Sequence, residues 1–292
     1  MKPNFTIIIA ISIALSIVLA HSSAWAKGIT TSFPILTLIT KDLAPPNISI
    51  RTLTSSAEEA HHFEMTPKIL IELQNQDLII INGLNFEHWV DSIKTNLPKT
   101  LKIINATAGI KPLVLDHQEV DPHAWHDPQN LKKYIDNIQA ALVTQYPEHQ
   151  ATINTRSKIL KDRTQKLFEE YSQKFKSLNK NLTLVTSHDS MNYFAHAYGF
   201  NSLSLYDNHH GENLSPRQLT EKLKEIKKQK HRLFLLDSSD TDSNLKSWAQ
   251  KTNSAVIGII WSDGLPKTNP PQDILDYLEH NAKLVFESQQ KE

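Results

Sequence analysis

The chain has 292 residues, and its 31 basic and 31 acidic side chains give a formal net charge of zero. This balance argues against a nucleic-acid partner, because nucleic-acid binders carry an excess of basic residues. Hydrophobic residues make up 39% of the chain, which is too many for a disordered protein. The sequence contains no cysteine, so any transition-metal site in this chain must use histidine and carboxylate side chains.

Residues 1–26 have the pattern of a secretory signal peptide. Lys2 precedes an apolar run over residues 7–20, and Ala24 and Ala26 form the small-x-small pattern of a signal-peptidase site. The apolar run is shorter than the ~20 residues that span a bilayer. We therefore expect cleavage after Ala26 and export to the periplasm. Because a lipid-anchored exported protein needs a cysteine at its mature N-terminus, we expect a product without a lipid anchor.

The remaining chain alternates short apolar runs with helical periodicity, which predicts an α/β fold with mostly parallel sheets. We expect helices to begin after Thr66, Asp127 and Ser215, because each of these capping residues precedes a proline. Gly199 is expected to end another helix. The apolar runs that we expect to form strands are residues 47–53, 78–81, 182–185, 233–236 and 255–260.

The segment 148–178 contains neither glycine nor proline, and its apolar residues are spread among many charged ones. This pattern predicts one long, largely solvated helix. Because it lies in the middle of the chain, we expect it to join two lobes rigidly. The N-terminal α/β lobe would span residues 27–147, and the C-terminal α/β lobe residues 179–292.

Four polar side chains lie next to predicted strand ends or helix starts, where parallel α/β sheets bind ligands. They are His61, His123, His188 and Asp263. Two precede the long helix and two follow it, which favours a site shared between the lobes. Three imidazoles and a carboxylate suit tetrahedral Zn²⁺. Their spacing matches no local zinc motif, so the residues alone leave a structural role for each histidine open.

Other polar residues are weaker candidates. Asp237, which follows the strand at 233–236, is a candidate to orient a ligand, and His209 and His210 lie in a polar loop that is a candidate for weak metal binding. Glu64 is a candidate general base, which leaves open an exported zinc-dependent hydrolase. Such an enzyme needs an open coordination position for water. An accessory factor with a purely structural metal is a further alternative.

Around the four candidate ligands, the sequence resembles the substrate-binding proteins of zinc and manganese ABC importers, a family with two lobes and one rigid connecting helix. The resemblance covers most of the chain after residue 26 and includes landmarks near both ends. The segments that carry it are residues 60–67 (AHHFEMTP), 78–87 (LIIINGLNFE), 121–125 (DPHAW), 186–189 (TSHD), 215–217 (SPR) and 262–263 (SD).

The resemblance implies that His61, His123, His188 and Asp263 are the metal ligands. It also implies that Glu64 and Asp189 support them from beside the site. A histidine at the third ligand position resembles the zinc-importing members, whereas manganese members often have glutamate there. Because imidazole suits Zn²⁺ better than Mn²⁺, Zn(II) is the expected ligand and Mn(II) the alternative.

The same resemblance implies a binding protein without enzymatic activity that delivers its metal ion to an inner-membrane ABC permease. We expect it to be a monomer. Three features depart from the family pattern: Glu59 and Ala60 stand where Asp-Pro is usual before the first histidine, the long histidine-rich loop common in zinc members is missing, and His126 stands where an apolar residue is usual. The sequence gives no reason for His126.

Overall fold

The structure is a computed structural model, and the part of the chain that it describes comprises residues 27–54, 63–115, 119–178, 181–205, 215–238, 243–254 and 256–290. The signal peptide predicted for residues 1–26 lies outside these ranges, as do His61, His209 and His210. Within them, no helix has both the length and the apolar character needed to cross a lipid bilayer.

The N-terminal half is built on a four-stranded parallel sheet with the order β2-β1-β3-β4. Its strands are β1 (Gly28–Thr31), β2 (Ser49–Thr52), β3 (Leu78–Ile81) and β4 (Lys102–Asn105). The central strand β3 is a continuous apolar run, as expected where helices cover both faces of a parallel sheet. The helices of this half are α2 (Pro34–Leu43), α3 (Pro67–Leu73), α4 (Val90–Ile93) and α5 (Pro128–Gln145), with short 3-10 turns η2 (Lys94–Asn96), η4 (Ala124–His126) and η5 (Pro147–His149).

The C-terminal half repeats this plan with a second four-stranded parallel sheet, in the order β6-β5-β7-β8. Its strands are β5 (Leu182–Thr186), β6 (Asn201–Ser204), β7 (His231–Asp237) and β8 (Val256–Ile260). Its helices are the 3-10 turn η6 (Asp189–Met191), α7 (Asn192–Tyr198), α8 (Pro216–Lys228), α9 (Ser243–Lys251) and α10 (Ile274–Ser288). The expected α/β fold with two mostly parallel sheets is therefore confirmed.

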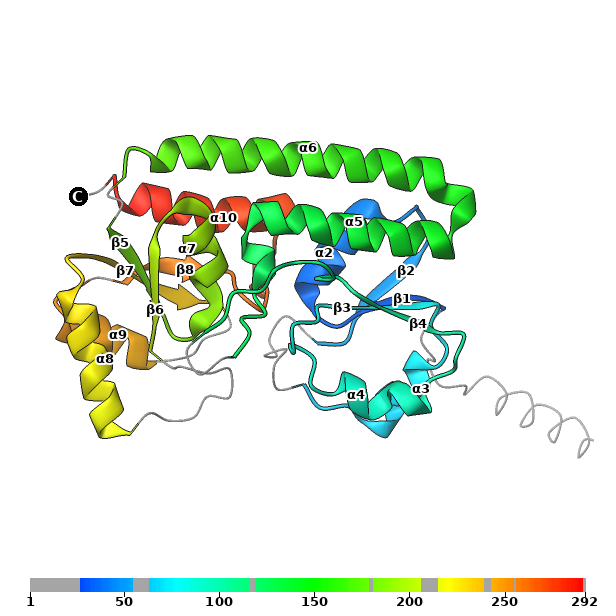
Figure 1. Cartoon of the computed structure of the whole chain (residues 1–292), viewed down its shortest axis with the longest axis horizontal. Helices are drawn as coiled ribbons and strands as arrows, with labels where there is room; N and C mark the ends of the chain where they lie inside the picture. The colour runs from blue at the N-terminus through cyan, green and yellow to red at the C-terminus, as the bar shows by residue number, and fades with distance from the viewer. Residues whose placement is uncertain are drawn as a thin grey trace, which may run out of the picture.

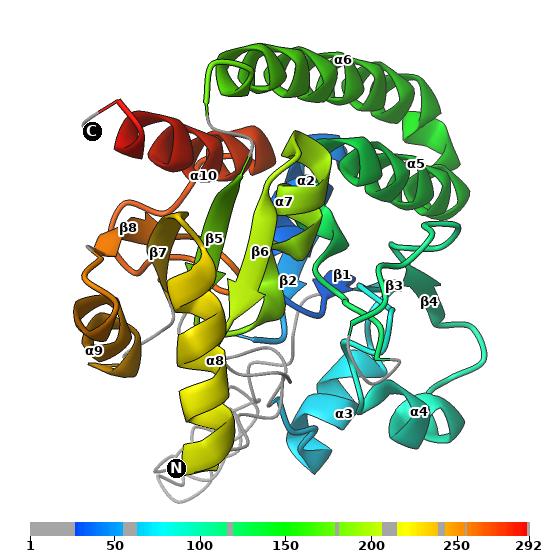
Figure 2. The same cartoon turned by 60° about the vertical axis from the view of Figure 1, so that its left-hand side comes forward.

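The long helix α6 (Gln150–Phe175) lies along one side of the molecule and contacts α5 and α2 of the first half and α10 of the second (Figure 1). Figure 2 shows the same neighbours from another direction. The buried residues Ile153, Leu160 and Leu167 repeat every seven positions, which places them on one face of the helix. The expected connecting helix is confirmed, and α6 falls inside the predicted segment 148–178. The lobe boundaries themselves stay a prediction.

The helix boundaries follow the capping signals of the sequence. The side chains of Thr66, Asp127 and Ser215 each accept a hydrogen bond from a backbone N–H of the first turn, and a proline follows each of them at the first helical position. Gly199 ends α7 with a φ of 78°, a conformation that a residue with a side chain rarely adopts. These predictions are confirmed.

One apolar core runs through both halves of the molecule. It contains Ile29 and Leu78 of the first sheet together with Leu184 and Leu235 of the second. Each sheet also packs against a smaller cluster of its own, which includes Ile79 in the first half and Phe234 in the second, but the largest cluster is shared by both sheets. Because packed interiors resist small displacements, this continuity holds the two sheets in a fixed relative position.

Candidate metal centre

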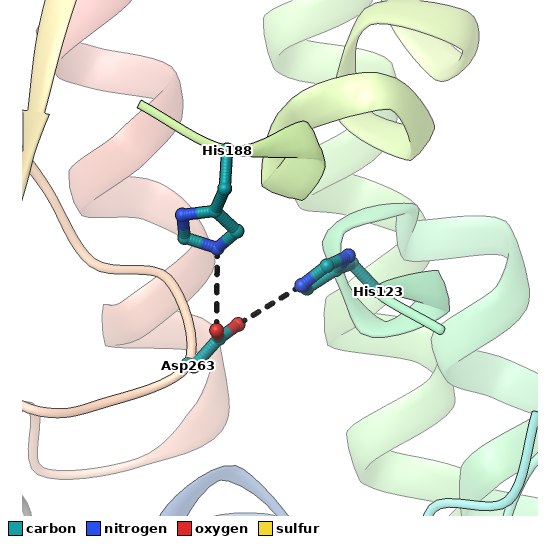
Figure 3. Close-up of side chains that lie close together, drawn as sticks. All are labelled: His123, His188 and Asp263. Atoms are coloured by element: carbon teal, nitrogen blue, oxygen red, sulfur yellow. Dashed lines mark ion pairs between the residues drawn. The ribbon is translucent and has the colours of Figure 1, made fainter. Parts of the chain in front are cut away.

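Three of the four predicted ligands meet between the two sheets. His123 directly precedes η4, His188 follows β5 by two residues, and Asp263 follows β8 by three. Figure 3 shows the two imidazoles approaching the carboxylate of Asp263 from different segments. His123 and Asp263 are buried, while the side chain of His188 is 21% exposed and is the most accessible of the three.

The three side chains offer their donor atoms to a common point. His123 Nε2 lies 3.2 Å from Asp263 Oδ1, and His188 Nε2 lies 3.2 Å from Asp263 Oδ2. One donor atom from each residue lies within 4.8 Å of the others. Ligands of tetrahedral Zn²⁺ stand ~2.0–2.2 Å from the metal, so their donor atoms are roughly 3–4 Å apart. Small side-chain adjustments would therefore let these three donors share one ion.

Asp121 orients the His123 ring. Its Oδ1 lies 2.7 Å from His123 Nδ1 and also accepts the backbone N–H of His123 at 2.9 Å. The carboxylate is held in turn by Asn192, whose side-chain amide donates to Oδ2 at 3.1 Å. A carboxylate that accepts from one imidazole nitrogen directs the other toward a metal and makes it more basic. Asp121 thus leaves Nε2 of His123 to face Asp263.

The charges at this centre depend on one another. Burial lowers the pKa of His123, but the carboxylates of Asp263 and Asp121 outweigh burial and raise it to about 10. Burial likewise lowers the pKa of His188, and Asp263 more than reverses this effect. The pKa of Asp263 would rise on burial, but the two imidazoles hold it well below its usual range. Without a metal, protons on the imidazoles balance the carboxylate.

Of the other predicted site residues, Glu64, Asp189 and Asp237 belong to the part of the chain that the structure describes. His61 is outside the described residues. Glu64 is exposed ahead of α3 and is not among the three clustered donors. Asp189 begins η6, and burial raises its pKa while a hydrogen bond from Ser204 opposes the rise. Asp237 ends β7, is buried, and helps to raise the pKa of His188. Metal ligation and support of the site by these residues stay predictions.

A buried polar network behind His123 was not anticipated from the sequence. Glu87 accepts hydrogen bonds from the Ser32 hydroxyl at 2.5 Å, from the Asn82 backbone at 2.7 Å and from the Gly83 backbone at 2.9 Å. The Asn82 side chain then donates to the carbonyl of Pro122 at 2.9 Å. Burial raises the pKa of Glu87 to about 7. The segment 82–87 thus fixes the backbone just before His123 through the hydrogen bond from Asn82 to Pro122.

One protein-family model matches nearly the whole chain after the predicted signal peptide. The model of the family described as zinc-uptake complex component A, periplasmic, matches residues 29–287. The iron-binding protein YfeA of Yersinia pestis is 28% identical, and the alignment covers 91% of this chain and 88% of YfeA. The manganese-binding lipoprotein MntA of Halalkalibacterium halodurans is 23% identical, over 87% of this chain and 85% of MntA. Relatives thus carry the names of different metals.

Solved structures show the same fold. A manganese-bound periplasmic metal-binding protein of Candidatus Liberibacter asiaticus is 27% identical with a TM-score of 0.81, covering 90% of this chain and 100% of that one. The periplasmic zinc-binding protein TroA of Treponema pallidum has a TM-score of 0.82 at 22% identity, over 90% of this chain and 99% of TroA. Both neighbours confirm the fold of two sheets and a long helix.

Several relatives are named lipoproteins. These names conflict with our expectation of a product without a lipid anchor. The expectation was based on the absence of cysteine from this sequence, which the relatives' names do not address. The comparisons therefore support export of the chain, but they do not support an exported protein without a lipid anchor.

Proposed function

Because the chain belongs to the family of periplasmic zinc-uptake component A, and is thus a metal-binding protein of an ABC importer rather than an enzyme, we propose that it binds one Zn²⁺ and delivers it to a membrane permease. The observation that carries the proposal is the convergence of His123, His188 and Asp263, which come from both halves of the molecule, on one point. His61 is proposed as the fourth ligand.

Donor chemistry favours zinc over manganese. A set of three imidazoles and one carboxylate is rich in nitrogen, whereas Mn²⁺ prefers a larger share of oxygen donors. Zinc also binds more tightly than manganese to a given nitrogen and oxygen site. Mn²⁺ is the second candidate, because relatives of this chain are named for manganese. We further propose that the protein is a monomer.

The first expected result is a stoichiometry of one Zn²⁺ per chain. Metal-free protein titrated with Zn²⁺ in a calorimeter should show a single site, and Zn²⁺ should displace Mn²⁺ that was bound beforehand. Metal analysis of the dialysed complex provides an independent count. A protein that bound no Zn²⁺, or one that retained Mn²⁺ against an equal concentration of Zn²⁺, would contradict the proposal.

Zinc binding is also expected to release protons. Since the pKa of His123 is raised to about 10, this imidazole carries a proton near pH 7 and must lose it to bind the metal. The pKa of His188 is also raised, because Asp263 more than offsets the effect of burial, and this adds to the release. For each proton that binding releases, the affinity for Zn²⁺ should therefore fall roughly tenfold per pH unit as the pH is lowered from 8 to 6. Calorimetry in buffers of different ionisation enthalpy measures the number released, and a value of zero would refute this expectation.

A further inference from the structure

Three buried groups meet at the hydroxyl of Tyr277 in α10. The hydroxyl donates to the carbonyl oxygen of Ser262 at 2.6 Å and accepts from Trp125 Nε1 at 3.2 Å. His126 Nε2 lies 3.3 Å from the same oxygen. The side chains of Tyr277, Trp125 and His126 are fully buried. We call Tyr277, Trp125, His126 and Ser262 the Tyr277 cluster.

The hydrogen atoms in this cluster can be assigned by counting donors. The single hydroxyl hydrogen of Tyr277 goes to Ser262, and the indole of Trp125 can only donate. His126 must therefore donate from Nε2, which makes it a neutral imidazole protonated at that nitrogen. Burial lowers the pKa of His126 to about 3, consistent with a neutral ring. The other nitrogen, Nδ1, has no hydrogen-bond partner in the described structure.

This assignment gives a reason for a histidine at position 126, where the resembling family usually has an apolar residue. An apolar side chain would remove one of the two donors to the Tyr277 oxygen. The buried Nδ1 without a partner is a cost, since a buried polar atom that lacks a hydrogen bond is destabilising. A histidine that brings this cost is better explained by the bond to Tyr277 than by packing alone.

The Tyr277 cluster joins the two segments that carry metal donors. Trp125 and His126 belong to η4, which begins directly after His123, and Ser262 directly precedes Asp263. The Tyr277 hydroxyl therefore ties the backbone beside Asp263 to the side chains that follow His123. The tie spans the two halves of the molecule, because η4 leads into α5 whereas α10 packs against β8.

Helix α10 also binds the segment before Asp263 through the side chain of Asn281. Asn281, one turn beyond Tyr277, accepts from the backbone N–H of Trp261 at 2.9 Å and donates to its carbonyl oxygen at 2.7 Å. With the bond from Tyr277 to Ser262, α10 fixes two successive residues before Asp263. The loop after β8 therefore cannot shift without breaking hydrogen bonds to α10.

We propose that Tyr277 and His126 are positioning residues that set the separation between the His123 imidazole and the Asp263 carboxylate, and thereby the affinity and geometry of metal binding. The inference rests on the function proposed above. Residues that orient metal ligands without touching the metal typically change affinity about 10–100-fold when they are replaced. We expect Tyr277→Phe, which removes only the hydroxyl, to act in this range.

The test uses full-length mature protein with the metal alone as the probe. Affinity for Zn²⁺ is measured by competition with a chromophoric chelator, and coordination geometry by the visible spectrum of the Co²⁺ form. Tyr146→Phe is the matched control, because it also removes a buried hydroxyl, one that has no hydrogen-bond partner in the described structure and lies at the far end of α5. Tyr277→Phe should lower Zn²⁺ affinity about 10–100-fold and change the Co²⁺ spectrum, and Tyr146→Phe should do neither.

A purely structural role would lower the melting temperature of Tyr277→Phe while leaving Zn²⁺ affinity within twofold of the wild type and the Co²⁺ spectrum unchanged. That result would overturn the inference alone. Should Tyr277→Phe fail to fold, His126→Phe removes one donor from the cluster and is expected to lower affinity roughly fivefold, again with a changed spectrum. A His126→Phe protein with wild-type Zn²⁺ affinity and an unchanged Co²⁺ spectrum would then overturn the inference. A wild type that bound no Zn²⁺ would overturn the proposed function, and this inference with it.

Discussion

Replacing His123 by alanine is expected to lower Zn²⁺ affinity by roughly 10²–10³-fold. Zinc sites in proteins contribute about 10–16 kcal/mol shared among four ligands, so one ligand accounts for about 2.5–4 kcal/mol. His123 is fully buried, and its Nε2 faces Asp263 at 3.2 Å. Competition titration of the metal-free protein with a chromophoric chelator measures the loss.

The matched control for this variant is His149→Ala. His149 precedes α6, its side chain is 38% exposed, and it lies outside the clustered donors. It should leave Zn²⁺ affinity unchanged, which excludes a general effect of losing an imidazole. Circular dichroism of the metal-free proteins checks that both variants fold. A His123→Ala protein that folds and binds Zn²⁺ within tenfold of the wild type would remove this residue from the proposed site.

The largest expected effect on stability is at Glu87. Glu87→Ala removes the acceptor for Ser32, Asn82 and Gly83 at once. Each buried donor left without a partner costs about 1–3 kcal/mol, so we expect the free energy of unfolding to fall by about 3–5 kcal/mol. Urea denaturation of the metal-free protein measures this difference. Glu169→Ala, on the exposed face of α6, should change it by less than about 0.5 kcal/mol.

The effect of Glu87→Ala should depend on pH with a definite sign. Burial raises the pKa of Glu87 from 4.5 to about 7, so the folded protein binds a proton here more tightly than the unfolded chain. The resulting stabilisation is fully present below about pH 4.5 and is lost as the pH rises through 7. The free energy of unfolding of the wild type should therefore exceed that of Glu87→Ala by more at pH 5 than at pH 8. The opposite trend would show that Glu87 is held as a carboxylate.

Much of the fold could be predicted because its signals are local. The strand at Leu78–Ile81 and the three proline-capped helices are encoded within a few residues each. Strand β1 and helix α2 were not predicted from the sequence, however. Helix α2 is buried on nearly all sides, so it has no polar face to produce a helical period. The strands β4 and β6 were also missed, because both are short edge strands rich in polar residues.

The candidate site divides in the same way. The proximity of His123, His188 and Asp263 could be predicted because ligand-binding residues gather at strand ends and helix starts, and because the surrounding segments resemble a known family. Tyr277 and Asn281 could not, since their partners are far away in the sequence. Trp125, for example, lies 152 positions before Tyr277. Only the packing of α10 against the end of β8 shows what these side chains hold.

The rigid mounting of α6 has a consequence for how the cargo leaves. Helix α6 has 26 residues and contacts α2 and α5 of the first half and α10 of the second, so moving the halves apart would break its packing against one of them. We expect unloading to proceed instead by the stepwise loss of metal–ligand bonds while the two halves keep their relative position. The imidazole of His188, whose side chain is 21% exposed, is then the first ligand expected to dissociate.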